Sequence, residues 1–303
     1  MANNFNLDIE QVAQIAAKLT GRDFNLAALI SRDVEAAFNP GAGNKIRVSV
    51  PAAIPTRTRG VYDKTTALVA DELSEQFIEV TLADHVYNLA VLSDGDLSLN
   101  ITEYGRQVLA PQTRAIAAKI EALTAATMSA TPAAVGITYS AAAPAKAFTA
   151  ARRVLRDNGV PGDAILRAAV GSSVYADLLD APVGHGFDAD GKVRGFTVVE
   201  STRLDAEDIV AFIPQAFTLV ARAPLVPAGA AYGASIVTPV FDDENGAQFA
   251  IRVINDYDSN VAADRSLVGT FCAVQAMPLA VDQEDGNVEL VAHGGAVRIA
   301  TGA

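Results

Sequence analysis

The chain has 303 residues, 50% hydrophobic and 19% charged, which is enough to bury the core of one large domain or two modest ones. Its 23 Lys and Arg against 35 Asp and Glu give a net charge of −12, and so acidic a chain is a poor sequence-independent nucleic-acid binder, because neutralising phosphates needs clustered cations. No segment has the ~20 uninterrupted apolar residues of a membrane span, and the N-terminus lacks a signal-peptide pattern. We expect no membrane partner and a chain that stays soluble or assembles in the cytoplasm.

The N-terminal segment, residues 7–38, has the apolar spacing of two short amphipathic helices. The first stripe consists of Ile9, Val12, Ile15, Ala16 and Leu19, and Gly21 is a candidate helix stop. The second stripe consists of Leu26, Leu29, Ile30, Val34 and Phe38. Both predicted helices need a partner surface for their apolar sides.

Two strands follow, joined by a long loop. Ile46, Val48 and Val50 alternate with polar residues, and residues 78–82 alternate again, so they are expected to pair as a two-stranded ribbon. About 25 residues separate them, and compact domains seldom carry a loop of that length without a functional reason. An isolated ribbon is also marginally stable. We therefore predict a projecting arm that is stabilised by another surface.

Residues 99–128 give the strongest helical signal. Ile116, Ile120, Leu123 and Thr127 share one face with alanines around them, so other elements can approach closely. Pro111 either begins a new helix in its first turn or kinks a longer one. From residue 102 onward the predicted helix rises roughly 40 Å, long enough for the spine of a domain.

The next hundred residues alternate helices and strands, which is typical of an α/β lobe. Residues 144–157 form a predicted helix, strands are expected at 164–170 and 194–202, and over 208–222 an apolar strand is expected to run into a short helical turn. A short helix over 172–181 has Ser172 or Ser173 as its expected N-cap. Beyond this lobe, Asn245-Gly246 and Asp285-Gly286 are two-residue turn signals that predict two β-hairpins.

Catalytic and ligand-binding patterns are missing from the sequence. The phosphate-binding loop, the dinucleotide fingerprint and the nucleophile elbow have no match, and the acidic turns lack the spacing of calcium loops. His85, His185 and His293 are about a hundred residues apart, without metal-ligand spacing. Cys272 lies among apolar neighbours and is expected to be buried. We expect no catalytic residues, no metal, no cofactor and no enzymatic activity.

Several segments together resemble the major capsid proteins of tailed bacteriophages. They are GNKIRVSVPAA, LSLNITEYGRQVLAPQTRAIAAKI, GVPGDAILRAAVGSSVYADLLD and GKVRGFTVVEST, in this order over about residues 5–275. The resemblance implies the α+β Hong-Kong-type capsid fold. The implied parts are an N-terminal arm (1–42), an extended loop (43–92), the spine helix of a peripheral domain (93–130), an axial domain (131–235), return strands of the peripheral domain (236–275) and a C-terminal β extension (276–303).

The resemblance also implies a function and partners. Copies of the chain would form hexamers and pentamers of an icosahedral shell that encloses double-stranded DNA without sequence-specific binding, in a virion assembled in the bacterial cytoplasm. A scaffolding protein and a portal would take part. Since only about 40 residues precede the loop, we expect a separate scaffolding protein and no large cleavage.

Charge along the loop independently favours contact between copies. Residues 43–64 are mainly basic, and residues 71–84, which include Glu79 and Asp84, are acidic. Segments of opposite charge suit a head-to-tail contact, in which unlike surfaces of neighbouring copies meet around a ring. The candidate contact residues are Lys45, Arg47, Arg57, Arg59, Lys64, Asp71, Glu72 and Glu75.

Three alternatives stay open. An encapsulin-type nanocompartment has the same fold and encloses enzymes, a phage decoration or tail protein would be a small oligomer, and a hydrolytic enzyme lacks its site chemistry. Some members of the family join a loop lysine to a neighbour's asparagine. Lys64 with Asn255 or Asn260 are the candidates here, and because no Glu follows within fifteen residues of Asn260 we predict no cross-link.

Overall fold

The computed structural model describes residues 9–32, 43–50, 56–68, 70, 75–96, 103–182, 184–230, 232–239, 248–261, 263–283 and 288–300. The chain divides into two compact units, and each is built from three separate stretches. Unit 1 comprises Met1–Pro40, Leu82–Thr127 and Leu219–Val274, and unit 2 comprises Gly41–Thr81, Met128–Thr218 and Gln275–Ala303. Both units therefore depend on contacts between residues far apart in the sequence.

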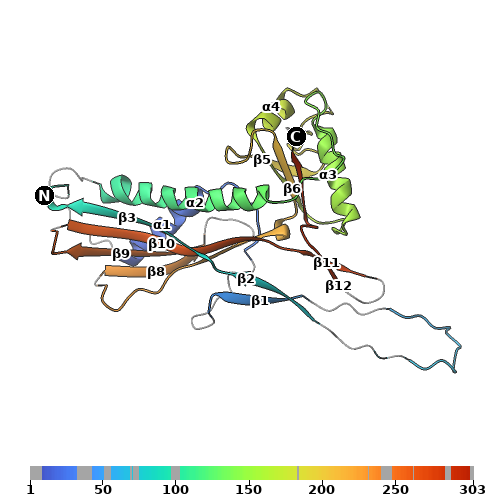
Figure 1. Ribbon diagram of the computed structural model, residues 1–303, viewed down its shortest axis with the longest axis horizontal. Helices are drawn as coiled ribbons and strands as arrows, with labels where there is room; N and C mark the ends of the chain where they lie inside the picture. The colour runs from blue at the N-terminus through green and yellow to red at the C-terminus, as the bar shows by residue number, and fades with distance from the viewer. Residues whose placement is uncertain are drawn as a thin grey trace. The chain divides into compact units, whose positions relative to one another are not determined.

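Unit 1 is organised around one antiparallel sheet, with strand order β3-β10-β9-β8 and with β7 also paired to β10 (Figure 1). Its strands are β3 (Asp84–Ser93), β7 (Phe217–Arg222), β8 (Tyr232–Pro239), β9 (Gln248–Asp258) and β10 (Ala263–Ala276). The hairpin expected around Asn245-Gly246 forms from β8 and β9, while its turn lies outside the described residues. β3 was predicted as part of the extended loop, and it pairs with β10 because its apolar alternation continues this sheet.

The predicted spine is α2 (Ala110–Ser129), and it runs along this sheet (Figure 1). Ile116 and Ile120 are fully buried, as their shared face requires. A π-helical turn, η3 (Gly105–Leu109), leads directly into α2, and the N–H of Ala110 bonds to the carbonyl of Gly105. Pro111 thus lies in the first turn of α2, where the N–H that proline lacks would have no partner within the helix. The π-helical turn lies just before it.

The N-terminal segment packs inside unit 1. The helix α1 (Ile9–Arg22) contacts β8 and β9 through a buried row of small residues. The second predicted helix was wrong for residues 23–32, which form turns, because buried Glu121 of α2 binds backbone N–H groups there. Val34 and Phe38 lie outside the described residues.

Unit 2 contains a four-stranded sheet, β13-β6-β4-β5, with helices beside it (Figure 1). Its elements are α3 (Ala145–Asp157), β4 (Leu166–Val170), α4 (Ser172–Asp180), β5 (Phe196–Glu200), β6 (Asp208–Phe212), the 3-10 turn η4 (Pro214–Ala216) and β13 (Ala296–Ala300). β4 and β5 are parallel and joined through α4, as the α/β pattern predicted. The C-terminal segment has a use that the sequence did not reveal, since β13 pairs with β6 and completes the sheet.

The start of α4 corrects one prediction. Gly171, and neither Ser172 nor Ser173, is the N-cap residue, and it makes no side-chain cap. A Cβ atom at Gly171 would lie 2.0 Å from the carbonyl oxygen of Asp205, so the close approach of two backbones decides this position.

Two ribbons complete unit 2. β1 (Lys45–Val50) pairs with β2 (Gln76–Thr81) and forms the predicted ribbon, antiparallel and with a register from Lys45↔Thr81 to Val50↔Gln76. β11 (Leu279–Asp282) pairs with β12 (Val288–Val291), while the Asp285-Gly286 turn lies outside the described residues. The side-chain amide of Gln76 in β2 donates a hydrogen bond of 2.7 Å to the carbonyl of Val288 in β12, so the two ribbons are in direct contact. No helix in the described ranges has both the length and the apolar character needed to cross a bilayer.

Candidate inter-subunit surfaces

The base of the extended loop carries ion pairs within its own chain. Glu79 of β2 lies opposite Arg47 of β1, and its carboxylate is 3.2 Å from Arg47 Nε and 3.4 Å from Lys45 Nζ. The hydrogen bond from Arg47, followed by the charge of Lys45, holds the pKa of Glu79 below its usual value. Two of the predicted contact residues therefore stabilise the ribbon directly, and their part in a contact between copies stays a prediction.

The loop tip, residues 56–68, has an ordered turn centred on Asp63. The Asp63 carboxylate accepts hydrogen bonds from the backbone and hydroxyl groups of Thr65 and Thr66, and its own N–H donates to the Gly60 carbonyl. These bonds, led by the one from the Thr66 hydroxyl, hold the pKa of Asp63 far below its usual range. Arg59 Nη1 donates to the Thr66 carbonyl at 2.9 Å, so local hydrogen bonds stabilise the conformation of the tip.

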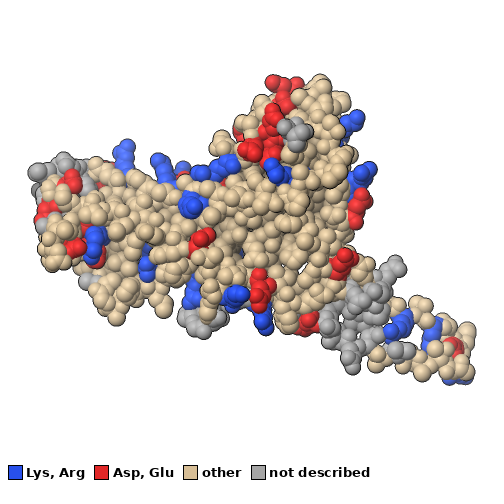
Figure 2. Space-filling model, in the orientation of Figure 1, with Lys and Arg blue, Asp and Glu red and all other residues tan. Residues whose placement is uncertain are grey.

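The outer side chains of this loop tip are apolar and basic. Val61 and Tyr62 are 93% and 92% exposed, so this chain covers almost none of their surface. Arg57, Arg59 and Lys64 are also exposed, and Lys and Arg outnumber acidic side chains along the loop at the right of Figure 2. Glu75 is exposed at the start of the return strand, whereas Asp71 and Glu72 lie outside the described residues.

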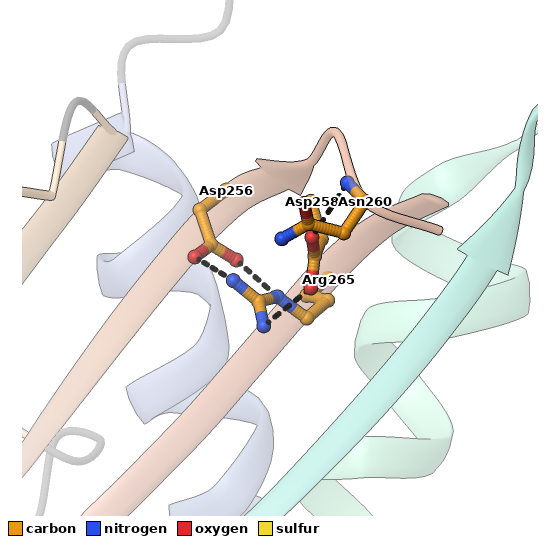
Figure 3. Close-up of polar contacts among 4 residues, drawn as sticks. All are labelled: Asp256, Asp258, Asn260 and Arg265. Atoms are coloured by element: carbon orange, nitrogen blue, oxygen red, sulfur yellow. Dashed lines mark hydrogen bonds and ion pairs between the residues drawn. The ribbon is translucent and has the colours of Figure 1, made fainter. Parts of the chain in front are cut away.

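A second charged cluster lies where the β9–β10 hairpin of unit 1 turns (Figure 3). The Arg265 guanidinium binds Asp256 through two bonds of 2.7 and 3.1 Å, and it reaches Asp258 at 3.1 Å. Asp258 also accepts the N–H of Asn260 at 3.0 Å. The cluster holds two carboxylates against one guanidinium, so this end of the sheet keeps an excess of negative charge.

The two asparagines named as cross-link candidates have different surroundings. Asn255 is half-buried, and its Oδ1 lies 3.1 Å from the Tyr104 hydroxyl, which is also 2.6 Å from Ser266 Oγ. Burial of Tyr104 raises the pKa of its hydroxyl, which keeps this group a neutral hydrogen-bond partner. Asn260 is exposed at the hairpin turn.

Covalent cross-linking between copies is expected to be absent. Joining Lys64 to an asparagine requires a carboxylate that takes up a proton from the ammonium group. The acid next to Asn260 is Asp258, and it is already bound to Arg265. Assembled particles boiled in detergent should run as a single band on a denaturing gel. A ladder of covalent oligomers that disappears in a Lys64→Ala variant would contradict this expectation.

A buried carboxylate that the sequence analysis did not single out connects the N-terminal segment to α2. Glu121 is 4% exposed, and its oxygens accept the N–H groups of Asn25, Leu26 and Ala27, each at 2.9 Å. The available signal was one acidic residue next to Ile120 in an alanine-rich helix. The residues that it binds are about 95 positions away, so the sequence pattern alone could not pair them.

Groups that often carry chemistry have structural surroundings here. Cys272 is fully buried, and burial together with the nearby charge of Asp84 raises the pKa of its thiol to about 12. The side chains of His, Cys, Asp and Glu form no group of three or more that could hold a metal ion in the described part of the chain.

Comparison with solved structures identifies the fold. A structure of Mycobacterium phage Che8 matches with a TM-score of 0.60 and 17% identity over 91% of each chain. The capsid of cyanophage A-1(L) matches with a TM-score of 0.58 and 12% identity over 99% of this chain and 94% of that one. A virus-like particle from Pyrococcus furiosus matches with a TM-score of 0.51 and 10% identity over 96% and 98%.

These matches cover nearly the whole of each chain and confirm the predicted α+β Hong-Kong-type capsid fold. No family model matches the sequence, and no curated protein matches it either. The likeness is therefore one of three-dimensional fold, at 10–17% sequence identity.

Proposed function

We propose that this chain is the major capsid protein of a tailed bacteriophage and that its copies form the icosahedral shell around a double-stranded DNA genome. The observation that carries the proposal is the nearly full-length match to phage capsid structures, at 99% and 94% coverage for the A-1(L) capsid. The braced loop tip supports it, because the exposed Val61 and Tyr62 need a covering surface.

The composition supports a passive role toward DNA. Each chain has a net charge of −12, so a shell built from its copies does not attract DNA phosphates and encloses the DNA without binding it. The proposed partners are copies of the chain in hexamers and pentamers, with a scaffolding protein and a portal during assembly in the host cytoplasm. The chain acts by assembly and not by catalysis.

Assembly of the purified chain tests the proposal. We expect size-exclusion chromatography with light scattering to show capsomers or megadalton particles, and negative-stain imaging to show closed shells when a scaffolding protein is co-expressed. The physical reason is that exposed apolar and charged surfaces repeated on every copy become buried together in a closed lattice. A stable folded monomer at high concentration, with scaffolding protein present, would contradict the proposal.

An encapsulin-type compartment is the second candidate, favoured by the match to the Pyrococcus furiosus virus-like particle. Both candidates predict closed particles, so the contents distinguish them. Nuclease-protected DNA of genome length inside particles from the native source would support the phage capsid, and a packaged enzyme would support the compartment.

A further inference from the structure

The large sheet of unit 1 has helices on one face. Ser266 of β10 bonds through its hydroxyl to Gln112 of α2, so its side chain points toward that helix. Side chains alternate along a strand, so Gly269 belongs to the opposite face, together with its register partners Tyr87 on β3 and Arg252 on β9. We call this side the open face of the sheet. Figure 3 views it near the β9–β10 turn, with the helices behind the strands.

Arg252 on the open face is half-buried, and only part of its guanidinium group is bonded. Its Nη1 donates to the carbonyl of Leu225 at 3.0 Å. Its Nε is buried and has no hydrogen-bond partner among the residues that the structure describes. No carboxylate in that part of the chain forms an ion pair with this side chain, although the chain has 35 acidic residues. A buried donor without a partner costs free energy, so the unpaired nitrogen indicates a missing acceptor.

A chain segment that crosses the open face fixes the position of the guanidinium. Val226 contacts β8, because a Cβ atom placed on Gly233 would lie 2.6 Å from its side chain. Leu225, the preceding residue, supplies the carbonyl that binds Nη1 of Arg252. The edge of the guanidinium formed by Nε and Nη2 stays unbonded within the described residues. This edge has the two parallel donors that match two oxygens of a carboxylate or a phosphate.

His85 of β3 lies over Gly269, between Tyr87 and Arg252. Its Nε2 is 3.2 Å from the position that a Cβ atom on Gly269 would take, so the missing side chain makes room for the imidazole. The imidazole contacts the rings of Tyr87 and Phe271, with centroids 5.2 and 4.9 Å apart. Burial, followed by the charge of Arg252, lowers the pKa of His85. An anion beside both side chains would reverse the second effect.

Other charged groups near His85 compensate one another. Asp84 and Lys119 line, together with His85, a hollow of about 330 Å³ between β3 and α2. Their charges are opposite, so this hollow has no charge of its own while His85 is neutral. The uncompensated positive charge here is therefore that of Arg252.

We propose that Arg252 and His85 form a binding site for an oxyanion, namely a carboxylate or a phosphate group. The Nε and Nη2 groups of Arg252 donate to two of its oxygens, and protonated His85 adds a second positive charge. The bond to Leu225 already holds the guanidinium in place, so little conformational freedom is lost on binding. The site goes beyond the proposed shell function, and its ligand is either a free ion or a group carried by a second macromolecule.

NMR titration of the histidines in the unassembled chain tests the site, because the chain has three histidines that can be followed separately. The pH titration is recorded in sodium chloride, in sodium phosphate and in sodium acetate at equal ionic strength, which keeps general screening constant. We expect phosphate to raise the pKa of His85 by at least about 0.5, because a nearby negative charge favours the protonated imidazole. His185 and His293 should titrate alike in all three salts.

Substitutions of Arg252 supply the controls, and circular dichroism checks that each variant folds. Arg252→Gln should abolish the effect of phosphate on His85, and Arg252→Lys should keep a smaller effect, because it retains the charge without the two-donor edge. Arg265→Gln is the matched control. Arg265 lies on the same face but already binds Asp256 and Asp258, so its loss should leave the response of His85 unchanged.

Cryo-electron microscopy of assembled particles then identifies the source of the oxyanion. An isolated density peak beside Arg252 indicates a free ion, and density continuous with another polypeptide indicates a carboxylate side chain; either result supports the site. The proposal is overturned if the pKa of His85 is the same in all three salts and a resolved Arg252 has no density beside it. An equal response of His85 in the wild type and in Arg252→Gln would also overturn it. Neither outcome bears on the proposed shell.

Discussion

Replacing Glu121 by Gln is expected to lower the free energy of unfolding by about 2–4 kcal/mol, as the loss of buried hydrogen bonds to a charged group does. Both carboxylate oxygens of Glu121 accept backbone N–H groups, two on Oε1 and one on Oε2. Glutamine keeps one acceptor oxygen, and its amide NH₂ then faces an N–H donor that has no other place to bond. The penalty is large because Glu121 is only 4% exposed.

The measurement is urea unfolding of the unassembled chain, together with hydrogen exchange at the amides of Asn25, Leu26 and Ala27. We expect these amides to lose protection in Glu121→Gln. Glu103→Gln is the matched control, because its side chain is 62% exposed, and its effect should stay within about 0.5 kcal/mol. Unchanged protection at the three amides would show that the carboxylate does not hold the N-terminal segment in solution.

Local patterns in the sequence predicted most of the separate elements. The alternation at 45–50 and 78–82 predicted both strands of the ribbon and their pairing, and turn signals predicted two hairpins. The spine helix follows from an apolar face and many alanines. Each of these signals depends on neighbouring residues, which is why periodicity alone was sufficient.

The errors concern contacts between distant residues. Residues 23–32 have helical spacing, yet Glu121 binds their N–H groups in a turn, and no local pattern records that competition. Gly171 was overlooked as an N-cap because the backbone that crosses it comes from residue 205. The pairing of β13 with β6 likewise joins segments about ninety residues apart. In the first case a tertiary contact overrode local preference, and in the other two the deciding partner lies too far along the chain for a local pattern to record it.

The sequence predicted the candidate loop surface only in part. Counting charges identified the basic segment but could not distinguish the cations of the loop tip from Lys45 and Arg47. Those two bind Glu79 in the same chain. The bracing role of Asp63 and the exposure of Val61 and Tyr62 appear only with coordinates.

Reversing the charge of Arg57 and Arg59 together is expected to reduce particle formation strongly while leaving the fold of the single chain intact. Both side chains are exposed, and the bond from Arg59 to the Thr66 carbonyl is a surface contact. Arg57→Glu with Arg59→Glu should therefore change the far-UV circular dichroism and the melting temperature little. If the two arginines lie on an acidic surface of the next copy in the shell, the substitution places carboxylates beside that surface, and every copy repeats the repulsion.

Two controls separate this contact from other effects of the substitutions. Arg57→Lys with Arg59→Lys keeps the charge and should assemble almost like the wild type. Arg106→Glu with Arg153→Glu changes the net charge by the same amount at side chains that are 85% and 77% exposed, so it tests for general repulsion. Particle yield is measured by light scattering across a salt series, because exposed charge contacts weaken as salt screens them. Normal yield of the loop variant at every salt concentration would mean that the charges of Arg57 and Arg59 make no contact between copies on which assembly depends. A lowered melting temperature of its monomer would instead mean that the two arginines stabilise the fold of their own chain.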